Sequence, residues 1–337
     1  TFQLVFTPIH GTSITALPQV LKKAGYKNVF TVPEQEKPDG SFPTVPSPNP
    51  ETPEALKMAL DLAKEKNTDL VIGTDPDADR LGIIVKDIKN DWKFLNGNQI
   101  MMVLTEYLLH KKASQGTLTP QHFIASTIVS TPAIEKMASY YNVQFKKCLT
   151  GFKWIAKLIH DFPELEYIGG GEESFGYLVG DTVRDKDAIS ASLLACEIAV
   201  EAKAKQTNLH ELLIACYKKY GAYKERLISI SKPGKSGLEE INTLMDGFRR
   251  NNPKTISGIK VITVEDYLTG ISKTLSTQQE TKIDLPKANV LLFKLEEGTQ
   301  IALRPSGTEP KIKYYFSVNQ KFNSNQNWEQ QESAMDA

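Results

Sequence analysis

The sequence predicts an α/β protein in which two similar domains with mixed or mostly parallel sheets precede a smaller α+β domain. Strand-like apolar segments alternate with helical segments up to about residue 220 of the 337 residues. The alternation runs twice, with a break near residue 96, which indicates a duplicated domain. From Ala222 onward the regular alternation of strands and helices ends, and most segments have the composition of strands.

Composition excludes several classes of protein. The 40 Lys+Arg residues balance the 40 Asp+Glu residues, so no nucleic-acid or anionic-membrane partner is expected. The three cysteines (Cys148, Cys196 and Cys216) are far apart and odd in number, which argues against a disulfide scaffold and suits the cytoplasm. The longest apolar stretch, 188–202, contains two serines and two glutamates, so it is expected to be a core helix and not a membrane span.

The first domain is expected at residues 1–96. Gly25 follows a helical segment as a C′ residue does, and Thr52 followed by Pro53 is typical of a helix start. A proline-rich segment at 33–50 is expected to be irregular. The expected elements are strands at 4–6, 29–32 and 69–73, helices at 15–24 and 52–66, and a hairpin at 80–95.

The second domain, expected at 97–221, repeats this pattern, and a smaller third domain is expected at 222–318. In the second domain we expect helices at 96–110, 132–140, 152–160, 187–205 and 208–220, and strands at 123–129, 144–148 and 167–169. In the third we expect a helix at 238–250 and strands at 258–265, 290–295, 300–304 and 312–318. The tail at 319–337, rich in Gln, Asn, Ser and Glu, is expected to be disordered.

The strongest motif is a run of alternating carboxylates, Asp75, Asp77 and Asp79, directly after a buried-type strand. Alternation in an extended loop can turn all three toward one side, and hard oxygen donors suit Mg²⁺ or Ca²⁺. An EF-hand is excluded because its sixth and twelfth positions would be Arg80 and Lys86, where Gly and Glu are needed. The alternative is an acidic surface turn. Arg80 itself could reach a phosphate or form an ordinary salt bridge.

A second motif, at 169–176, has four glycines around two glutamates and a serine. Glycines allow close backbone approach to a ligand, and Glu172 and Ser174 can accept from and donate to sugar hydroxyls. The segment is neither a P-loop nor a dinucleotide-binding fingerprint. A polar glycine-rich turn is the alternative interpretation.

A third motif, at 303–310, has the composition of a phosphate cradle. It contains a forked guanidinium donor, hydroxyl groups and successive backbone N–H groups, in Arg304, Ser306, Gly307 and Thr308. A capped turn would use the same residues. Two weaker candidates are the pair Thr150 and Gly151, and Lys186, which lies between two aspartates and could equally belong to a solvated charge run.

Together the three motifs resemble the α-D-phosphohexomutase superfamily of phosphoglucomutases and phosphomannomutases. The resemblance spans nearly all of 1–318, and the residues of the motifs are most similar to those of the phosphoglucomutase-2/phosphopentomutase-like branch. It implies that Asp75, Asp77 and Asp79 bind Mg²⁺ and that Glu172 and Ser174 bind sugar hydroxyls, with Thr150 and Gly151 near the sugar ring. It further implies a distal phosphate site at Arg304, Ser306, Gly307 and Thr308, and catalytic roles for Lys186 and Arg80.

The resemblance implies that the intact protein interconverts glucose 1-phosphate and glucose 6-phosphate through a phosphoserine and a sugar 1,6-bisphosphate. A phosphopentose, phosphomannose or phosphoglucosamine substrate is the alternative within the fold, and a non-catalytic metal- or sugar-phosphate-binding module is the alternative outside it. The expected partner is a small phosphosugar, and no oligomeric state is predicted.

The sequence departs from this family at the nucleophile. The family's phosphoserine lies in a Thr-Ala-Ser-His-Asn-Pro loop that is absent from these 337 residues. The segment 47–50 (Ser-Pro-Asn-Pro) has part of that wording but no histidine. Because the chain opens without methionine on a strand-like segment, we expect a fragment that lacks the N-terminal domain and is inactive alone.

Overall fold

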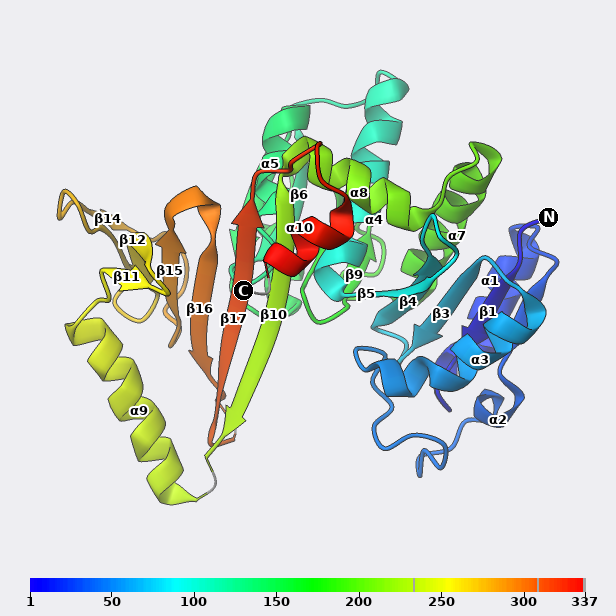
Figure 1. The fold of residues 1–337 in the computed structure, drawn as a ribbon, viewed down its shortest axis with the longest axis horizontal. Coiled ribbons are helices and arrows are strands. Elements are labelled where there is room, and N and C mark those ends of the chain that lie inside the picture. The colour runs from blue at the N-terminus through cyan, green and yellow to red at the C-terminus, as the bar shows by residue number, and fades with distance from the viewer. Residues whose placement is uncertain (233, 308, 336–337) are drawn as a thin grey trace. The chain divides into compact units, whose positions relative to one another are not determined.

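The computed structural model describes residues 1–232, 234–307 and 309–335. The chain divides into two compact units, and the boundary in the sequence lies between Lys219 and Tyr220. The first unit holds both predicted α/β domains and the second is rich in strands (Figure 1). This arrangement confirms the predicted fold class. Among the described residues, no helix is both long and apolar enough to cross a membrane.

The first domain is built on the five-stranded sheet β2-β1-β3-β4-β5. The first three strands are parallel, whereas β4 and β5 form the predicted antiparallel hairpin. Its elements are β1 (Leu4–Thr7), η1 (Thr12–Thr15), α1 (Leu17–Lys23), β2 (Val29–Thr31), α2 (Pro33–Glu36), η2 (Pro53–Leu56), α3 (Lys57–Lys66), β3 (Leu70–Thr74), β4 (Leu81–Lys86) and β5 (Trp92–Leu95). The short helix α2 lies in the segment expected to be irregular.

The second domain repeats this order as β7-β6-β8-β9, again with three parallel strands and one antiparallel strand. Its elements are α4 (Gly97–Ser114), β6 (His122–Thr127), α5 (Ala133–Tyr141), β7 (Gln144–Cys148), α6 (Lys153–Asp161), β8 (Glu166–Gly171), β9 (Tyr177–Val179), α7 (Ala188–Ala204) and α8 (Leu209–Tyr220). The matching strand order supports the duplication inferred from the pattern.

Two helices of the second domain join the two sheets into one unit. Helix α4 packs against β8 and α5 of its own domain, while α7 packs against α1, β3 and β4 of the first domain. Both helices are capped by polar side chains. The Asn96 side chain accepts from the backbone of Gln99 in a capping box, and Asp187 accepts from Ile189 and Ser190. These caps fix the first turns of α4 and α7, which contact the loops that carry the predicted site residues.

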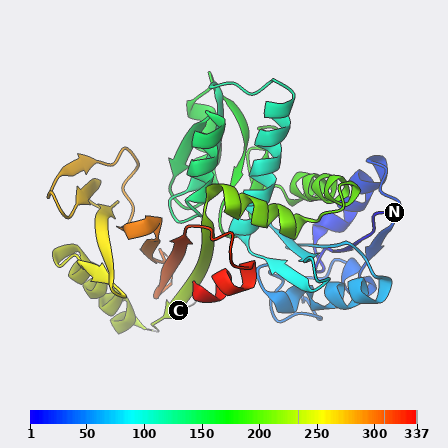
Figure 2. The same cartoon turned by 45° about the horizontal axis from the view of Figure 1, so that its top comes forward.

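The second unit is an antiparallel sheet in the order β10-β17-β16-β15-β12-β13-β14, with β11 paired to β12. Helix α9 lies against it and contributes Ile241 and Met245 to the core (Figures 1 and 2). The elements are β10 (Ala222–Ser231), α9 (Lys235–Arg250), β11 (Thr255–Ile256), β12 (Ile259–Asp266), β13 (Ile271–Thr274), β14 (Glu280–Lys282), β15 (Leu291–Leu295), η3 (Glu296–Gly298), β16 (Gln300–Pro305), β17 (Lys311–Gln320) and α10 (Trp328–Ala334).

The tail differs from its expected disorder. Strand β17 extends to Gln320, and α10 begins at Trp328, after the N-cap residue Asn327, whose side chain accepts a hydrogen bond from the backbone N–H of Gln330. The buried Gln331 donates to the backbone carbonyls of Asn323 and Gln326. Polar composition suggested disorder, but these amide contacts order the turn before the helix.

Candidate active site

The three predicted metal ligands lie together in the loop after β3. A carboxylate oxygen of Asp75, one of Asp77 and one of Asp79 lie within 4.8 Å of one another. Ala78, between the last two, has a left-handed backbone (φ 62°), which lets the short loop turn its aspartates to one side. Asp75 is buried and Asp77 is exposed, so the cluster lies at the surface end of the strand.

Asp75 anchors this loop. Its Oδ1 accepts hydrogen bonds from the backbone N–H groups of Asp79 and Arg80, both at 2.9 Å. Burial raises the pKa of Asp75 to about 7, and the negative charges of Asp79 and Asp77 act in the same direction. A bound cation would reverse both effects, because it favours the charged carboxylates.

The carboxylate donor set fits a divalent cation. Asp79 Oδ1 is buried and makes no hydrogen bond with any described residue, although Arg80 Nε lies 3.6 Å away. Converging carboxylates repel each other, and hard oxygen ligands of high charge are those that Mg²⁺ prefers. The observation favours a metal site over the alternative of an acidic surface turn.

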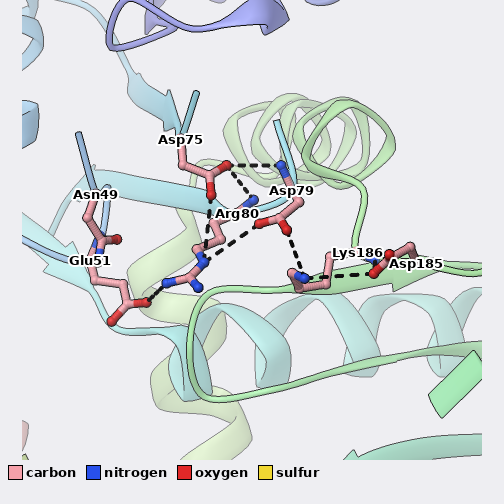
Figure 3. A network of polar contacts seen from close by, with 7 residues as sticks. All are labelled: Asn49, Glu51, Asp75, Asp79, Arg80, Asp185 and Lys186. Atoms are coloured by element: carbon pink, nitrogen blue, oxygen red, sulfur yellow. Dashed lines mark hydrogen bonds and ion pairs between the residues drawn. The ribbon is translucent and has the colours of Figure 1, made fainter. Parts of the chain in front are cut away.

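Arg80 clamps the loop from one side (Figure 3). Its guanidinium forms an ion pair with Glu51 and lies 3.6 Å from both Asp75 Oδ2 and Asp79 Oδ1. Glu51 comes from the proline-rich segment before η2, where Asn49 Oδ1 accepts from the Glu51 backbone at 3.0 Å. Both alternatives for Arg80 therefore stay relevant, since it forms salt bridges and lies beside the metal ligands.

Lys186 meets the same cluster from the second domain (Figure 3). Its Nζ lies 2.8 Å from Asp79 Oδ2 and 3.7 Å from Asp185 Oδ1, and its side chain is only 15% exposed. Burial alone would lower the pKa of Lys186, but the hydrogen bond to Asp79 and the surrounding carboxylates outweigh it and raise the pKa. Lys186 is thus an ammonium inside the site, and the reading of a solvated charge run does not hold.

The Lys186→Met variant is expected to bind Mn²⁺ about three- to tenfold more tightly, because a part-buried ion pair worth about 1 kcal/mol no longer competes for Asp79. Isothermal titration with MnCl₂ measures this change. The matched control is Lys157→Met, which removes a Lys–Asp pair of the same 2.8 Å distance on exposed α6. Equal affinities in the two variants would contradict the competition.

Backbone contacts join the loop after β3 (74–80), the predicted metal loop, to the glycine-rich loop at 172–176, the predicted sugar-binding loop. The N–H of Leu81 donates to the carbonyl of Phe175 at 3.0 Å, and Arg80 pairs with Gly176 in an isolated antiparallel bridge. The N–H of Ala188, at the start of α7, donates to the carbonyl of Ala78 at 3.0 Å. The two loops and the Lys186 segment therefore form one connected layer.

A glycine at the start of α4 allows the predicted sugar-binding loop to pack closely against this helix. A Cβ at Gly97 would lie 2.2 Å from the carbonyl oxygen of Glu173 and 2.7 Å from the Phe175 nitrogen, so only glycine permits this approach. Within the loop, Glu172 is buried and Ser174 is half-buried. Glu172 lies close enough to Arg80 and Lys186 that its negative charge contributes to the raised pKa of each.

Glu173 holds the loop from behind and was missed by sequence reasoning. Its Oε2 accepts from Thr127 Oγ1 and Ser130 Oγ, each at 3.1 Å, and its backbone N–H donates to Ser130 Oγ at 3.2 Å. Burial, with the neighbouring Glu172 charge, raises the pKa of Glu173. Thr127 ends β6 and Ser130 follows that strand, so no local pattern could have paired these hydroxyl residues with this glutamate.

The loop with Thr150 and Gly151 lies near the site because the next residue, Phe152, packs close to Lys186. Gly151 has a positive φ of 110°, and Phe152 is buried with its ring centroid 5.8 Å from Lys186 Nζ. Thr150 Oγ1 is buried and has no hydrogen-bond partner among the described residues. This loop therefore lies beside the lysine, with a polar atom still to be satisfied.

A third loop, at 10–12, supports the loop after β3. The N–H and Oγ1 of Thr12 both donate to the carbonyl of Pro76, at 2.8 and 2.9 Å. A Cβ at Gly11 would lie 2.4 Å from Pro76 Cα. His10 is buried and bonded to Lys37 O and Thr44 Oγ1, so it has a structural role.

The predicted phosphate loop belongs to the second unit. Arg304 lies near the end of β16, where Ser306 N–H donates to Lys311 O at 2.7 Å and Ser306 Oγ accepts from the Glu309 N–H at 3.3 Å. Gly307 is exposed, and Thr308 lies outside the described residues. The bonded turn is the geometry of a capped loop, and phosphate binding there stays a prediction.

Two family models match nearly all of the first unit. The family model described as phosphoglucomutase/phosphomannomutase, alpha/beta/alpha domain II, matches residues 1–89, and the model for alpha/beta/alpha domain III matches residues 96–220. The chain belongs to the phosphoglucomutase/phosphomannomutase family. A curated phosphoglucomutase of this family, from Staphylococcus epidermidis, is 41% identical over 317 residues, which cover 94% of this chain and 57% of the relative. The chain thus spans little more than half the length of that relative.

Solved structures of sugar-phosphate mutases share the fold. A putative phosphomannomutase from Thermus thermophilus has a TM-score of 0.67 at 18% identity, over 95% of this chain and 57% of that one. An Aspergillus fumigatus N-acetylphosphoglucosamine mutase, in complex with GlcNAc-6P and magnesium, has a TM-score of 0.52 at 13% identity, over 94% and 58%. At these identities the likeness shows the fold alone.

Proposed function

We propose that this chain supplies the metal-binding and sugar-binding domains of a phosphohexomutase that interconverts glucose 1-phosphate and glucose 6-phosphate. The observation that carries the proposal is the joining of three loops at one place: the carboxylates of Asp75, Asp77 and Asp79, the Lys186 ammonium and the Glu172 loop. Identity to a curated phosphoglucomutase supports the glucose substrate, and the magnesium and GlcNAc-6P of the Aspergillus mutase support the ligand classes.

The proposed reaction needs a phosphoserine, a sugar hydroxyl and a protected site. The phosphoserine O–P bond breaks, a P–O bond to the sugar hydroxyl forms, and the proton of that hydroxyl leaves to a nearby base. The reverse transfer from the other end of the 1,6-bisphosphate restores the phosphoserine. When bound, Mg²⁺ supplies charge neutralisation for the transferring phosphoryl group, which is the main need of this chemistry.

The chain's own residues provide positioning. Asp75, Asp77 and Asp79 would hold the cation, and Lys186 would hold a proton beside the phosphoryl group. Glu172 and Ser174 would orient the sugar by its hydroxyls, supported by Glu173. Arg304 and Ser306, with Gly307 and Thr308, would grip the phosphate that is not transferred, so that its binding energy aligns the sugar.

The phosphoserine must come from elsewhere, because these 337 residues contain no Thr-Ala-Ser-His-Asn-Pro loop. We propose that it is contributed by a domain equivalent to the part of the relatives that the chain does not match. This proposal predicts that the chain alone does not turn over glucose 1-phosphate.

A chimera tests the function directly. The matched segment of the Staphylococcus epidermidis phosphoglucomutase is replaced by this chain, and glucose 6-phosphate formation is measured with Mg²⁺ and glucose 1,6-bisphosphate. We expect turnover from the chimera, and a loss of at least about 100-fold in its Asp77→Asn form. An inactive, folded chimera, or equal activity of the Asp77→Asn form, would refute the proposal. Panels of mannose, glucosamine and pentose phosphates on the active chimera define the preferred sugar.

A further inference from the structure

A pocket of about 440 Å³ lies between α4, α7 and α8, inside the first unit. Its floor is apolar and well packed, since Val103, Ile198, Ala202 and Cys216 are all nearly inaccessible to solvent. Both the volume and the apolar lining with a few polar groups are typical of small-molecule sites. None of its lining residues takes part in the proposed mutase chemistry.

The pocket is separate from the candidate active site. Its lining comes from 103–114 of α4 and from 198–205 at the end of α7, together with α8. The opposite ends of the same two helices, at Gly97 and Ala188, contact the sugar-binding and metal loops. At a rise of about 1.5 Å per residue, the ten residues from Ala188 to Ile198 already span roughly 15 Å. The pocket is therefore a second site on shared helices.

The charges at the rim favour an anionic ligand. Lys219 donates to Glu106 at 2.9 Å, and Lys111 forms an ion pair with Glu201, so each lining carboxylate already has a lysine. Lys205, the exposed C-cap residue of α7, forms no ion pair with any residue that the structure describes. One positive charge therefore remains at the mouth above an apolar floor.

We propose that this pocket binds an amphipathic monoanion, an apolar chain or ring that carries one carboxylate. The apolar part would contact the accessible lining residues Leu212 and Ala215 above this floor, and the carboxylate would lie beside Lys205. The inference does not depend on the proposed mutase function, because the ligand, the lining residues and the probe are all different.

The experiment titrates the full chain with sodium octanoate, and with 1-octanol as the neutral match, by isothermal titration calorimetry. Two variants address the pocket: Ala215→Trp places a large side chain at an exposed lining position, and Lys205→Gln removes the unpaired cation. Their matched controls are Ala113→Trp, at an exposed α4 position outside the lining, and Lys64→Gln on exposed α3. Thermal melting of each variant confirms that it folds.

We expect saturable octanoate binding that is lost in Ala215→Trp and weakened about two- to fivefold in Lys205→Gln, with both controls unchanged. Octanol should bind at least about twofold more weakly than octanoate. The proposal is overturned if octanoate does not bind, if the pocket variants match their controls, or if octanol binds equally well. It is also overturned if light scattering shows a dimer that Ala215→Trp disrupts, since a second copy would then occupy the pocket.

Discussion

The Asp75→Asn variant is expected to lose divalent-metal binding by roughly 100-fold or more, because it removes the buried charge of the ligand set. The fold should survive, since an asparagine Oδ1 can accept the same two backbone hydrogen bonds from Asp79 and Arg80. Without metal, the variant should be more stable than the parent at and above neutral pH by roughly 1 to 3 kcal/mol, because it removes a negative charge that is buried beside two other carboxylates. Titration with MnCl₂ and thermal melting measure the two effects.

The pH dependence of this difference has a defined sign. The pKa of Asp75 is about 7 in the folded, metal-free protein and 3.8 in its ordinary state, so the folded state binds the proton more tightly. Its contribution to stability is therefore fully present below about pH 4 and is lost as the pH rises through about 7. The gap between Asp75→Asn and the parent should be large at pH 8 and nearly absent at pH 4. A constant gap across this range would contradict the cause assigned here.

The Arg80→Met variant is expected to be destabilised by roughly 2 kcal/mol in the absence of metal. Its guanidinium lies beside the carboxylates of Glu51, Asp75 and Asp79. Without it, Lys186 is the one cation among the described residues that forms an ion pair with any of these three carboxylates. The side chain is 34% exposed, so water screens part of the loss. Millimolar Mg²⁺ should restore part of the stability, because it returns positive charge to the cluster.

Denaturant unfolding with and without Mg²⁺ measures this effect. The control is Arg250→Met on the exposed end of α9, where the arginine forms no ion pair with any described residue and the change should stay within about 0.5 kcal/mol. If Arg80→Met unfolded at the same denaturant concentration as Arg250→Met, the clamp would have no energetic role.

Local patterns were sufficient to predict most of the first unit's strands and the loop in which three carboxylates come together. Continuous apolar runs such as 70–74 mark buried strands, and alternating carboxylates directly after such a strand predict a candidate site without any tertiary information. The same holds for the antiparallel hairpin that ends the first sheet. The short β9 was missed because three residues, Tyr177–Val179, give no detectable period.

Long-range pairings were beyond the sequence. Glu51 lies 29 positions before Arg80, and Ser130 lies 43 positions before Glu173, so neither contact has a local signature. The proline-rich segment that carries Glu51 has no hydrophobic period and was expected only to be irregular. Gly97 is read from sequence as part of a helix start, whereas its decisive property is the close approach of the Glu173 carbonyl.

Manganese-induced broadening of backbone amide signals tests most directly whether the three loops form one metal-centred site. A substoichiometric amount of MnCl₂ is added to the isotope-labelled chain, with Asp77→Asn as the control that lacks a ligand. We predict that the amides of Gly176 and Lys186 in the second domain broaden at the same Mn²⁺ concentration as those of Asp77 and Ala78, and that none does so in the control. Broadening confined to the loop after β3, or unchanged by Asp77→Asn, would contradict the account.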